Sequence, residues 1–473
     1  TAYEIYQCDW SSDVCSSDLL IVSLSLMRKL VGLVIIRSLI SGFALATPSS
    51  AAPKPPKLGS ICTKAGLFFD TPNLRYVCNV EGKKKVWREW TPTGVKGGSN
   101  SQAKNSASNF VVKIPITIPV AQKGPITFSN ILDHIDEIPT VSYGRIQDVI
   151  NSNSNVAVKN SVYVGPTTQI YIDGGLTRIQ EVLARTAQLW SGFSQPKFYS
   201  IYIYNGADEK LAEDKFTLDF KTKGYFSQNP EALAAPIRAL AGNCQVTLSP
   251  GTFGGSVGEC RGANSGAYSN SDDSFLQLGQ SDLSKNDPNT KDAVVIGHEY
   301  SHSVAQGQWI NNPNCVYSAT GEGCNRNAKS NQGFSPCWLY EGLPQANGAA
   351  VAESSLNGYM SWRKNIPYGW GPTTITDYTA SSLKDYLYKQ SNSTCYQNGN
   401  LYVLGYSVGA LTTEALIAIG GPQATMALFS QGAQGLDFAT AFNKVYGITW
   451  DSASTILSKV LAAEYSTFGP APK

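Results

Sequence analysis

Histidine, methionine and charge are scarce in this 473-residue chain, which contains only three His and three Met residues. Charged side chains make up 15% of it, and 37 basic residues nearly balance 35 acidic ones, for a formal net charge of +2. Nucleic-acid binding calls for a strongly basic face, but Lys83-Lys84-Lys85 is a short run in an otherwise balanced sequence. We therefore predict no nucleic-acid partner.

A Met at position 1 is also missing, and the first residues resemble translated sequencing-adapter sequence, so we expect residues 1–26 to be foreign to the folded protein. The basic pair Arg28-Lys29, the apolar stretch Leu30–Ala46 and a run of small residues then follow. That order is typical of a secretory signal peptide. We predict a signal peptide over residues 27–52 and a secreted or cell-surface protein, with an uncleaved amphipathic anchor as the alternative.

Cysteine usage fits export. No Cys-x-x-Cys pair is present that would indicate a thiolate metal site or a redox motif. An even number of cysteines after the leader is typical of disulfides formed in an oxidising compartment. Pairing between neighbours in the sequence closes the shortest loops and is the simplest expectation: Cys62 with Cys78, Cys244 with Cys260, Cys315 with Cys324, and Cys337 with Cys395.

Residues 53–92 are predicted to form a small module with Cys62 and Cys78. So short a segment needs a disulfide to supplement its core. It resembles the two-cysteine modules near the start of exported actinobacterial proteins, which implies cell-surface contact. It would then serve as a surface-attachment or spacer module; a small disulfide-stapled domain without a ligand of its own is equally compatible with its composition. The polar residues 93–109 are predicted to be a flexible linker, and residues 110–473 a second, larger domain.

The larger domain shows strand patterns before helical ones. Alternating apolar residues predict a strand over Val112–Ile118, and further strands are predicted over Phe198–Tyr204 and Ser274–Leu278. Helical spacing predicts a helix over Leu176–Trp190. Beyond Lys291 the pattern is mainly helical. We therefore predict an α+β fold in which a sheet lies beside a helical lobe.

Two of the three histidines stand in the segment His298-Glu299-Tyr300-Ser301-His302. Asp287-Pro288 is typical of a helix start, and predicts a single helix that runs through this segment. His298 and His302 then lie one turn apart on the same face, where two imidazoles can reach one zinc ion. Glu299 beside them can accept a proton from the attacking water.

A catalytic zinc site commonly takes three protein ligands. No His-x-x-Gly-x-x-His continuation follows His302, and Glu341 in the segment WLYEGLPQA is the best remaining ligand. HEYSH followed by this segment resembles the gluzincin zinc metallopeptidases. The resemblance implies a zincin-like metallopeptidase domain, with Zn²⁺ bound by His298, His302 and Glu341, and with Glu299 as general base.

The sequence also supports predictions for Pro344 and Gln345, which follow Glu341 in the chain. Pro344 is expected in the first turn of the helix that bears Glu341, where proline is tolerated. Gln345 either accepts a hydrogen bond from a ligand imidazole or is an exposed helical glutamine.

A long apolar helix is predicted from Leu401 to Gly420, ending at Gly420-Gly421-Pro422. Tyr402 and Tyr406 share one face of it. A phenol close to the metal can stabilise the oxyanion of a hydrolytic reaction, so these two tyrosines are candidates for that role. The alternative is that both merely pack in the core.

The sequence thus favours hydrolysis of peptide bonds in a peptide or protein substrate. The Gly-x-Met-Glu-Asn segment that anchors substrate amino termini in many aminopeptidases of this group is absent, which favours an endopeptidase. One alternative is a cell-surface binding protein whose zinc site is structural or inactive. Another is a zinc hydrolase of non-peptide amides.

Overall fold

A computed structural model describes the chain over residues 56–64, 68–70, 75–91, 94–95, 119–225, 231–244, 260–268, 272–309, 334–366, 377–389 and 399–468. The predicted leader (1–26), the signal peptide (27–52) and the strand at 112–118 lie outside these residues. The chain divides into two compact units, one within Val14–Asn105 and the other mainly within Ser106–Lys473.

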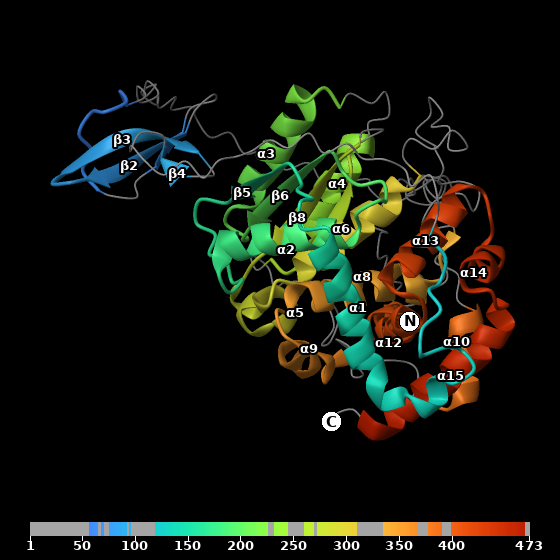
Figure 1. Ribbon diagram of the computed structural model, residues 1–473. Coiled ribbons are helices and arrows are strands. Elements are labelled where there is room, and N and C mark those ends of the chain that lie inside the picture. Colours follow the sequence, from blue (N-terminus) through green and yellow to red (C-terminus); the bar gives the residue numbers. More distant parts are fainter. Residues whose placement is uncertain are drawn as a thin grey trace, which may run out of the picture. The chain divides into compact units, whose positions relative to one another are not determined.

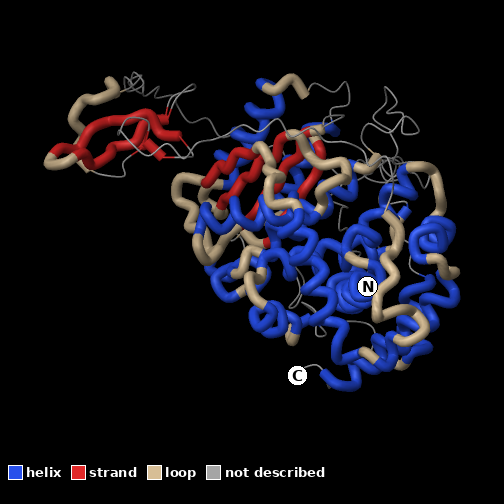
Figure 2. Tube along the Cα trace, viewed as in Figure 1, coloured by secondary structure: helices blue, strands red, loops and turns tan. Residues whose placement is uncertain are grey.

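The small unit contains a β-sheet, drawn in red in Figure 2. Its strands are antiparallel and follow the order β1-β2-β3-β4. Its strands are β1 (Phe68–Asp70), β2 (Arg75–Glu81), β3 (Lys84–Thr91) and β4 (Gly94–Val95). Gly82 begins the two-residue turn between β2 and β3 with a φ of 60°, in the left-handed region that such hairpin turns require. Cys62 and Cys78 form the predicted disulfide, and both are buried.

The large unit contains a four-stranded sheet in the order β5-β6-β8-β7. The parallel strands are β5 (Asn160–Val164), β6 (Phe198–Tyr204) and β8 (Asp273–Gly279). Strand β7 (Gly262–Ala267) runs antiparallel to β8 at the edge. The predicted strands over Phe198–Tyr204 and Ser274–Leu278 are confirmed. The α+β class is also confirmed, although helices alternate with these strands instead of following them.

Helices cover both faces of this sheet (Figure 1). On one face lie α2 (Gly175–Leu189) and α6 (Val294–Gly307), and on the other α3 (Glu209–Thr222) and α4 (Glu231–Gly242). Alternate side chains of β6 join different cores: Ile201 and Ile203 pack in the main cluster, whereas Tyr202 packs with Phe216 of α3. Burial on both faces is typical of a central parallel strand.

The rest of the large unit is a helical lobe built around α12 (Gly399–Gly420). Its Val403–Gly420 stretch is long and apolar enough to cross a membrane by length and composition, but 94% of it is buried inside the protein, as in a core helix. The predicted end at Gly420-Gly421-Pro422 is confirmed.

The helices that surround α12 are α1 (Ile138–Ser152), α8 (Cys337–Ala352), α9 (Leu356–Arg363), α10 (Ala380–Lys389), α13 (Pro422–Ala433), α14 (Phe438–Tyr446) and α15 (Trp450–Phe468). Short 3-10 turns cover Ile131–Asp133, Ile135–Glu137 and Asp282–Asn286.

The prediction of a single helix from Asp287 through the histidines was wrong. Asp287 does cap a helix, accepting a hydrogen bond from the Asn289 backbone N–H, but this helix, α5 (Pro288–Lys291), is one turn long. Ala293 then takes a left-handed conformation with a φ of 64°, and α6 begins at Val294. The buried Ala293 therefore separates the two helices and gives α6 a direction of its own.

The second predicted disulfide, Cys244–Cys260, is also confirmed and joins the segment just after α4 to the segment just before β7. Cys337 is disulfide-bonded as well. Cys315, Cys324 and Cys395, to which the remaining disulfide predictions refer, lie outside the described residues.

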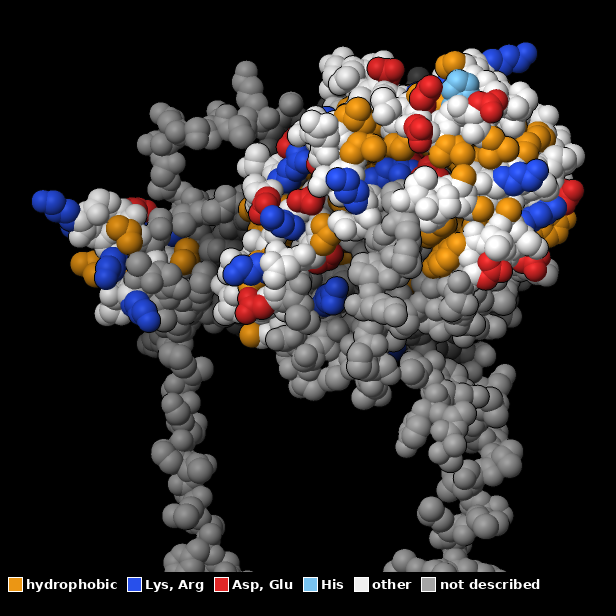
Figure 3. All heavy atoms as spheres, turned by 90° about the horizontal axis from the view of Figure 1, so that it is seen from below, with side chains coloured by type: hydrophobic (Ala, Val, Ile, Leu, Met, Phe, Trp, Pro, Cys, Tyr) orange, Lys and Arg blue, Asp and Glu red, His pale blue; other side chains and the backbone are white. Residues whose placement is uncertain are grey.

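On the face of the large unit seen in Figure 3, acidic and basic side chains are interspersed among the described residues.

Candidate metal centre

Helix α6 carries the two histidines with the geometry that their spacing predicts. His298 Nε2 and His302 Nε2 lie 3.0 Å apart, and the two side chains are 6% and 12% exposed. The helix is buried along most of its length, between the sheet and α8. The two imidazoles therefore present one nitrogen each to the same point inside the protein.

Glu341 of α8 meets this point from the opposite side. Its Oε2 atom lies 3.5 Å from His298 Nε2 and 3.3 Å from His302 Nε2. Zinc–ligand bonds of about 2.0–2.1 Å at tetrahedral angles place two ligand atoms roughly 3.3 Å apart. The three atoms thus have the mutual spacing of ligands to one ion, and the buried group of His298, His302 and Glu341 can hold a metal.

Glycines allow the three helices of the site to approach this closely. A Cβ on Gly348 of α8 would lie 2.8 Å from the His298 backbone nitrogen, and one on Gly342 would lie 2.1 Å from the carbonyl carbon of Gly409 in α12. Gly405, one turn before Gly409, packs against the Glu341 side chain. The Gly405-x-x-x-Gly409 spacing in the sequence is a signal for this contact that the sequence analysis missed.

The carboxyl end of α8 is capped by polar side chains from α1 and α2. Gln147 Nε2 donates to the Ala350 carbonyl at 2.7 Å, Arg185 Nε donates to the Val351 carbonyl at 2.9 Å, and the Arg178 guanidinium donates to the Ala352 carbonyl. Cationic groups at a helix C-terminus offset the negative end of the helix dipole. These contacts fix the helix that carries Glu341.

Pro344 lies in the interior of α8 and not in its first turn, so the earlier expectation was wrong. The helix begins at Cys337, and Pro344 is its eighth residue. A proline there has no N–H to donate to the carbonyl four residues earlier, which is that of Tyr340. Helix α8 therefore lacks one backbone hydrogen bond, at the carbonyl of Tyr340, the residue just before Glu341.

The electrostatics of the group favour a charged carboxylate. Burial alone would raise the pKa of Glu341, but the neighbouring imidazoles of His302 and His298 outweigh burial and hold it well below its ordinary value. Burial likewise disfavours a protonated His302, yet the Glu341 carboxylate reverses this and raises the pKa of that imidazole. An ionised carboxylate between two imidazoles is a donor set suited to a cation.

Glu299 lies next to His298 on α6 and is 7% exposed. Its Oε2 atom accepts a hydrogen bond of 2.7 Å from Ser265 Oγ on the edge strand β7. Ser265 could not be predicted from the sequence, because a serine in a weakly patterned strand 34 residues upstream carries no signal of its own. The candidate base therefore lies beside the metal-binding group and at the edge of the sheet.

Two tyrosines stack on the histidines. Tyr406 of α12, a predicted site residue, lies parallel to the His298 ring with centroids 5.5 Å apart. Tyr340, which sequence analysis missed although it adjoins Glu341, packs on His302 at 4.7 Å. The side chain of Tyr402 lies outside the described residues. A further tyrosine, Tyr386 of α10, has its pKa raised by burial and then by nearby charges that include Tyr465 and Glu341.

Gln345 takes neither of its expected roles. It is buried, and its Nε2 atom donates to Asn289 Oδ1 at 3.1 Å, so it links α8 to α5. His298 Nδ1 and His302 Nδ1 are also buried, and no described residue forms a hydrogen bond with either. Both imidazoles are thus restrained by packing against tyrosine rings and by the contact of their Nε2 atoms with Glu341.

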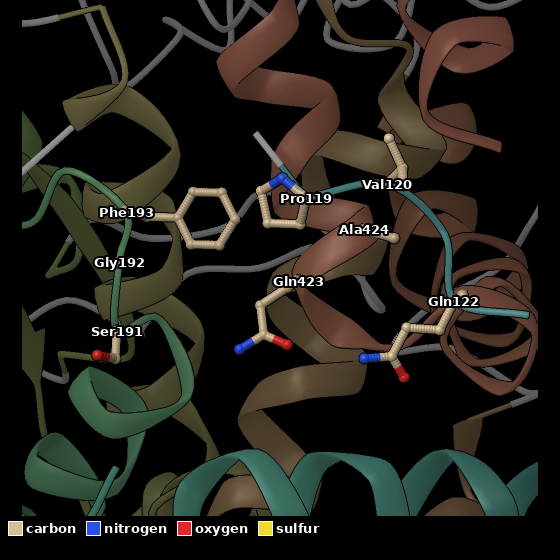
Figure 4. Close-up of a pocket in the computed structure, with 9 residues that line it drawn as sticks. Pro119, Val120, Gln122, Ser191, Gly192, Phe193, Gln423 and Ala424 are labelled. Carbon is tan, nitrogen blue, oxygen red and sulfur yellow. The ribbon is translucent and has the colours of Figure 1, made fainter. Parts of the chain in front are cut away.

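A separate hollow in the large unit lies between residues 119–122, residues 191–193 and the start of α13. Figure 4 shows the Phe193 ring beside Pro119, with the Gln423 and Gln122 side chains to one side of them. Its lining contains no charged side chain and no residue of the histidine and glutamate group. It therefore brings no acid, base or metal ligand together.

Comparisons with protein-family models, with curated proteins and with solved structures return no match to this chain.

Proposed function

We propose that this protein is a secreted zinc metallopeptidase with a zincin-like fold of the gluzincin type, and that it cleaves peptide bonds as an endopeptidase. The observation that carries the proposal is the convergence of His298, His302 and Glu341 on one point, with Glu299 held beside them. A purely structural metal site has no use for such an additional carboxylate.

The donor set fits zinc. His298, His302 and Glu341 would hold the ion, which makes three protein ligands, the usual number where a position is left for reaction. Bound zinc supplies Lewis acidity, which lowers the pKa of water and polarises a carbonyl group.

Glu299 performs the proton transfers in this proposal. Its carboxylate accepts a proton from the attacking water and passes it to the nitrogen of the leaving amine, so the C–N bond breaks and the carboxylate is regenerated. Its position one residue from a ligand histidine, and its low exposure, suit this role. Tyr406, with Tyr402 one turn earlier in α12, is the proposed donor to the oxyanion that develops on the carbonyl oxygen.

The edge strand β7 supports a peptide substrate over a smaller amide. β7 pairs with β8 on one side, and Ser265 at its centre contacts Glu299. An extended peptide can add to the edge of a sheet through main-chain hydrogen bonds. A substrate aligned in this way runs past Glu299, next to the metal-binding group.

Export and surface contact belong to the same proposal. The two complete disulfides fit an oxidising, extracellular setting. We propose that residues 27–52 direct export and that residues 53–92 contact the cell surface.

The decisive test of the enzymatic function is Glu299→Gln in the mature protein. The amide preserves size but cannot accept the proton, so hydrolysis should fall by about a hundredfold to ten-thousandfold. Cleavage of a broad peptide library and zinc content by metal analysis are measured together for parent and variant, and zinc content should be unchanged.

Three outcomes contradict the proposal in different ways. Near-parental cleavage by the zinc-loaded variant removes Glu299 as the base. A parent that binds zinc but cleaves no peptide favours the binding-protein alternative. A parent that hydrolyses only non-peptide amides in a parallel assay replaces the substrate class and keeps the site.

A further inference from the structure

The carboxylate of Glu299 is tied to the sheet by one hydrogen bond. Ser265 Oγ of β7 lies 2.7 Å from Glu299 Oε2. Among the described residues, no other group forms a hydrogen bond with this carboxylate. The orientation of the side chain proposed as the base therefore depends on a hydroxyl from another element.

The serine has one proton and two acceptors within reach. The second is the backbone carbonyl of Glu299, at 3.0 Å. Ser303 Oγ also donates to that carbonyl, at 3.2 Å, so the carbonyl has a side-chain donor of its own. Because hydrogen bonds to an ionised acceptor are the stronger ones, the Ser265 proton is directed to the carboxylate.

Strand β7 holds this serine in place from its other face. The neighbouring Asn264 is buried, and its Nδ2 atom donates to Gln277 Oε1 of β8 at 2.6 Å. Its Oδ1 atom accepts from Asn243 Nδ2 at 2.9 Å, and Asn243 precedes Cys244 in the disulfide that reaches the start of β7. A buried polar network and a covalent bond thus fix the strand from which Ser265 points to α6.

We propose that Ser265 is a positioning residue for Glu299, an assignment that rests on the proposed function. Its hydroxyl holds Oε2 and keeps its own proton throughout the reaction. Oε1 is left to take the proton from water and to deliver it to the leaving amine. Ser265 therefore affects the rate of the chemical step and not the binding of the metal.

The test compares Ser265→Ala, Ser265→Thr and Ser303→Ala. Ser303 is the matched control, because its hydroxyl contacts the same carbonyl of Glu299 but not the carboxylate. We expect Ser265→Ala to lower kcat by about 10- to 100-fold, the range for a lost hydrogen bond to a charged group, with KM and zinc content unchanged. Ser265→Thr keeps the hydroxyl and should restore most of kcat, and Ser303→Ala should stay within about threefold of the parent.

A readout independent of turnover is the crystal structure of the metal-free Ser265→Ala protein beside that of Ser265→Thr. The Glu299 carboxylate should leave its position in the alanine variant and keep it in the threonine variant. A carboxylate that stays in place in both overturns the proposal. So does a parental kcat in Ser265→Ala, or an equal fall of kcat in Ser265→Ala and Ser303→Ala.

The two proposals fail separately. If the parent hydrolyses nothing, the proposed function fails, and the two crystal structures still decide whether Ser265 positions Glu299. If the parent is active and Glu299→Gln is not, an unaffected Ser265→Ala variant removes only the role of the serine.

Discussion

Two buried ionic clusters border α12, and they are built differently. In the first, the Arg363 guanidinium of α9 donates to both carboxylate oxygens of Glu414 at 2.6 to 2.9 Å, and to Glu464 of α15 at 2.9 Å. Tyr359 Oη donates to Glu414 Oε1 at 2.5 Å. Burial disfavours the charged guanidinium, but the carboxylates outweigh burial and raise the pKa of Arg363. Opposite charges and donated protons hold this cluster together.

In the second cluster, formed by His298, His302 and Glu341, three atoms that can each donate a lone pair to a cation face one another. Two imidazole nitrogens lie 3.0 Å apart, and a carboxylate oxygen lies 3.3 and 3.5 Å from them. With neutral histidines, all three atoms can present lone pairs to the same point, and a cation is what such an arrangement binds. The difference separates a buried ionic group that stabilises the fold from one that is organised around a ligand.

Removal of the Arg363 guanidinium from the first cluster is expected to have the largest effect on stability. Arg363→Met leaves the buried Glu414 and Glu464 carboxylates without the cation that pairs with both of them, so the free energy of unfolding should fall by about 3–5 kcal/mol. Denaturant unfolding with the disulfides intact measures it.

The control for Arg363→Met is Lys384→Met. Lys384 pairs with Asp451 at 3.1 Å, but the two side chains are 33% and 68% exposed. An exposed pair contributes about 0.2–1 kcal/mol. Equal losses in the two variants would show that burial does not distinguish the first cluster from a surface pair.

Glu341→Gln tests the second cluster directly. Loss of a group that only hydrogen-bonds to a metal ligand lowers metal affinity by about 10- to 100-fold. The amide removes the negative charge of a proposed ligand itself, so zinc affinity should fall by more than this. Competition with a chromophoric chelator measures the affinity. Glu353→Gln, which makes the same change at the end of the same helix but outside the cluster, should leave affinity within a few-fold of the parent. Parental affinity in Glu341→Gln would remove this glutamate from the ligands.

Gly348→Ala tests whether the second cluster depends on the approach of α6 and α8. The added Cβ would meet backbone atoms of His298 and Val294 at 2.8 and 2.9 Å, which cannot move cheaply. We expect a loss of about 1–3 kcal/mol in stability, together with weaker zinc binding as Glu341 is displaced from the histidines. Thermal unfolding with and without zinc measures both effects.

Gly144→Ala in α1 is the matched control for Gly348→Ala, because a Cβ there meets nothing within 4 Å. It should stabilise the protein by about 0.4–1 kcal/mol. A Gly348→Ala variant as stable as the parent would mean that the helices can separate without cost.

Much of the site could be predicted because its signals are local. The four-residue spacing of His298 and His302 corresponds to about one turn of an α-helix, so the pair shares a face wherever that helix lies in the fold. The short run of aromatic and β-branched residues at Phe198–Tyr204 predicted β6 in the same local way. The two disulfides that the structure describes completely each join cysteines 16 residues apart, so short loops sufficed to pair them.

Other predictions failed because the fold overrode a local signal. Asp287-Pro288 does start a helix, yet Ala293 ends it in a left-handed conformation that alanine adopts only when its surroundings impose it. Gln345 is one turn from Glu341 as predicted, but packing buries it against Asn289 and not against an imidazole.

By itself, the sequence determined the local geometry: which residues share a helix face, where the strands β6 and β8 lie, and where α12 ends. Only the tertiary structure decided that Glu341 reaches the histidines, that Ser265 holds Glu299 and that Arg363 is buried between two glutamates. These contacts join residues between 34 and 101 positions apart. They depend on how closely helices and strand edges pack, which glycines such as Gly348 permit and which no local periodicity encodes.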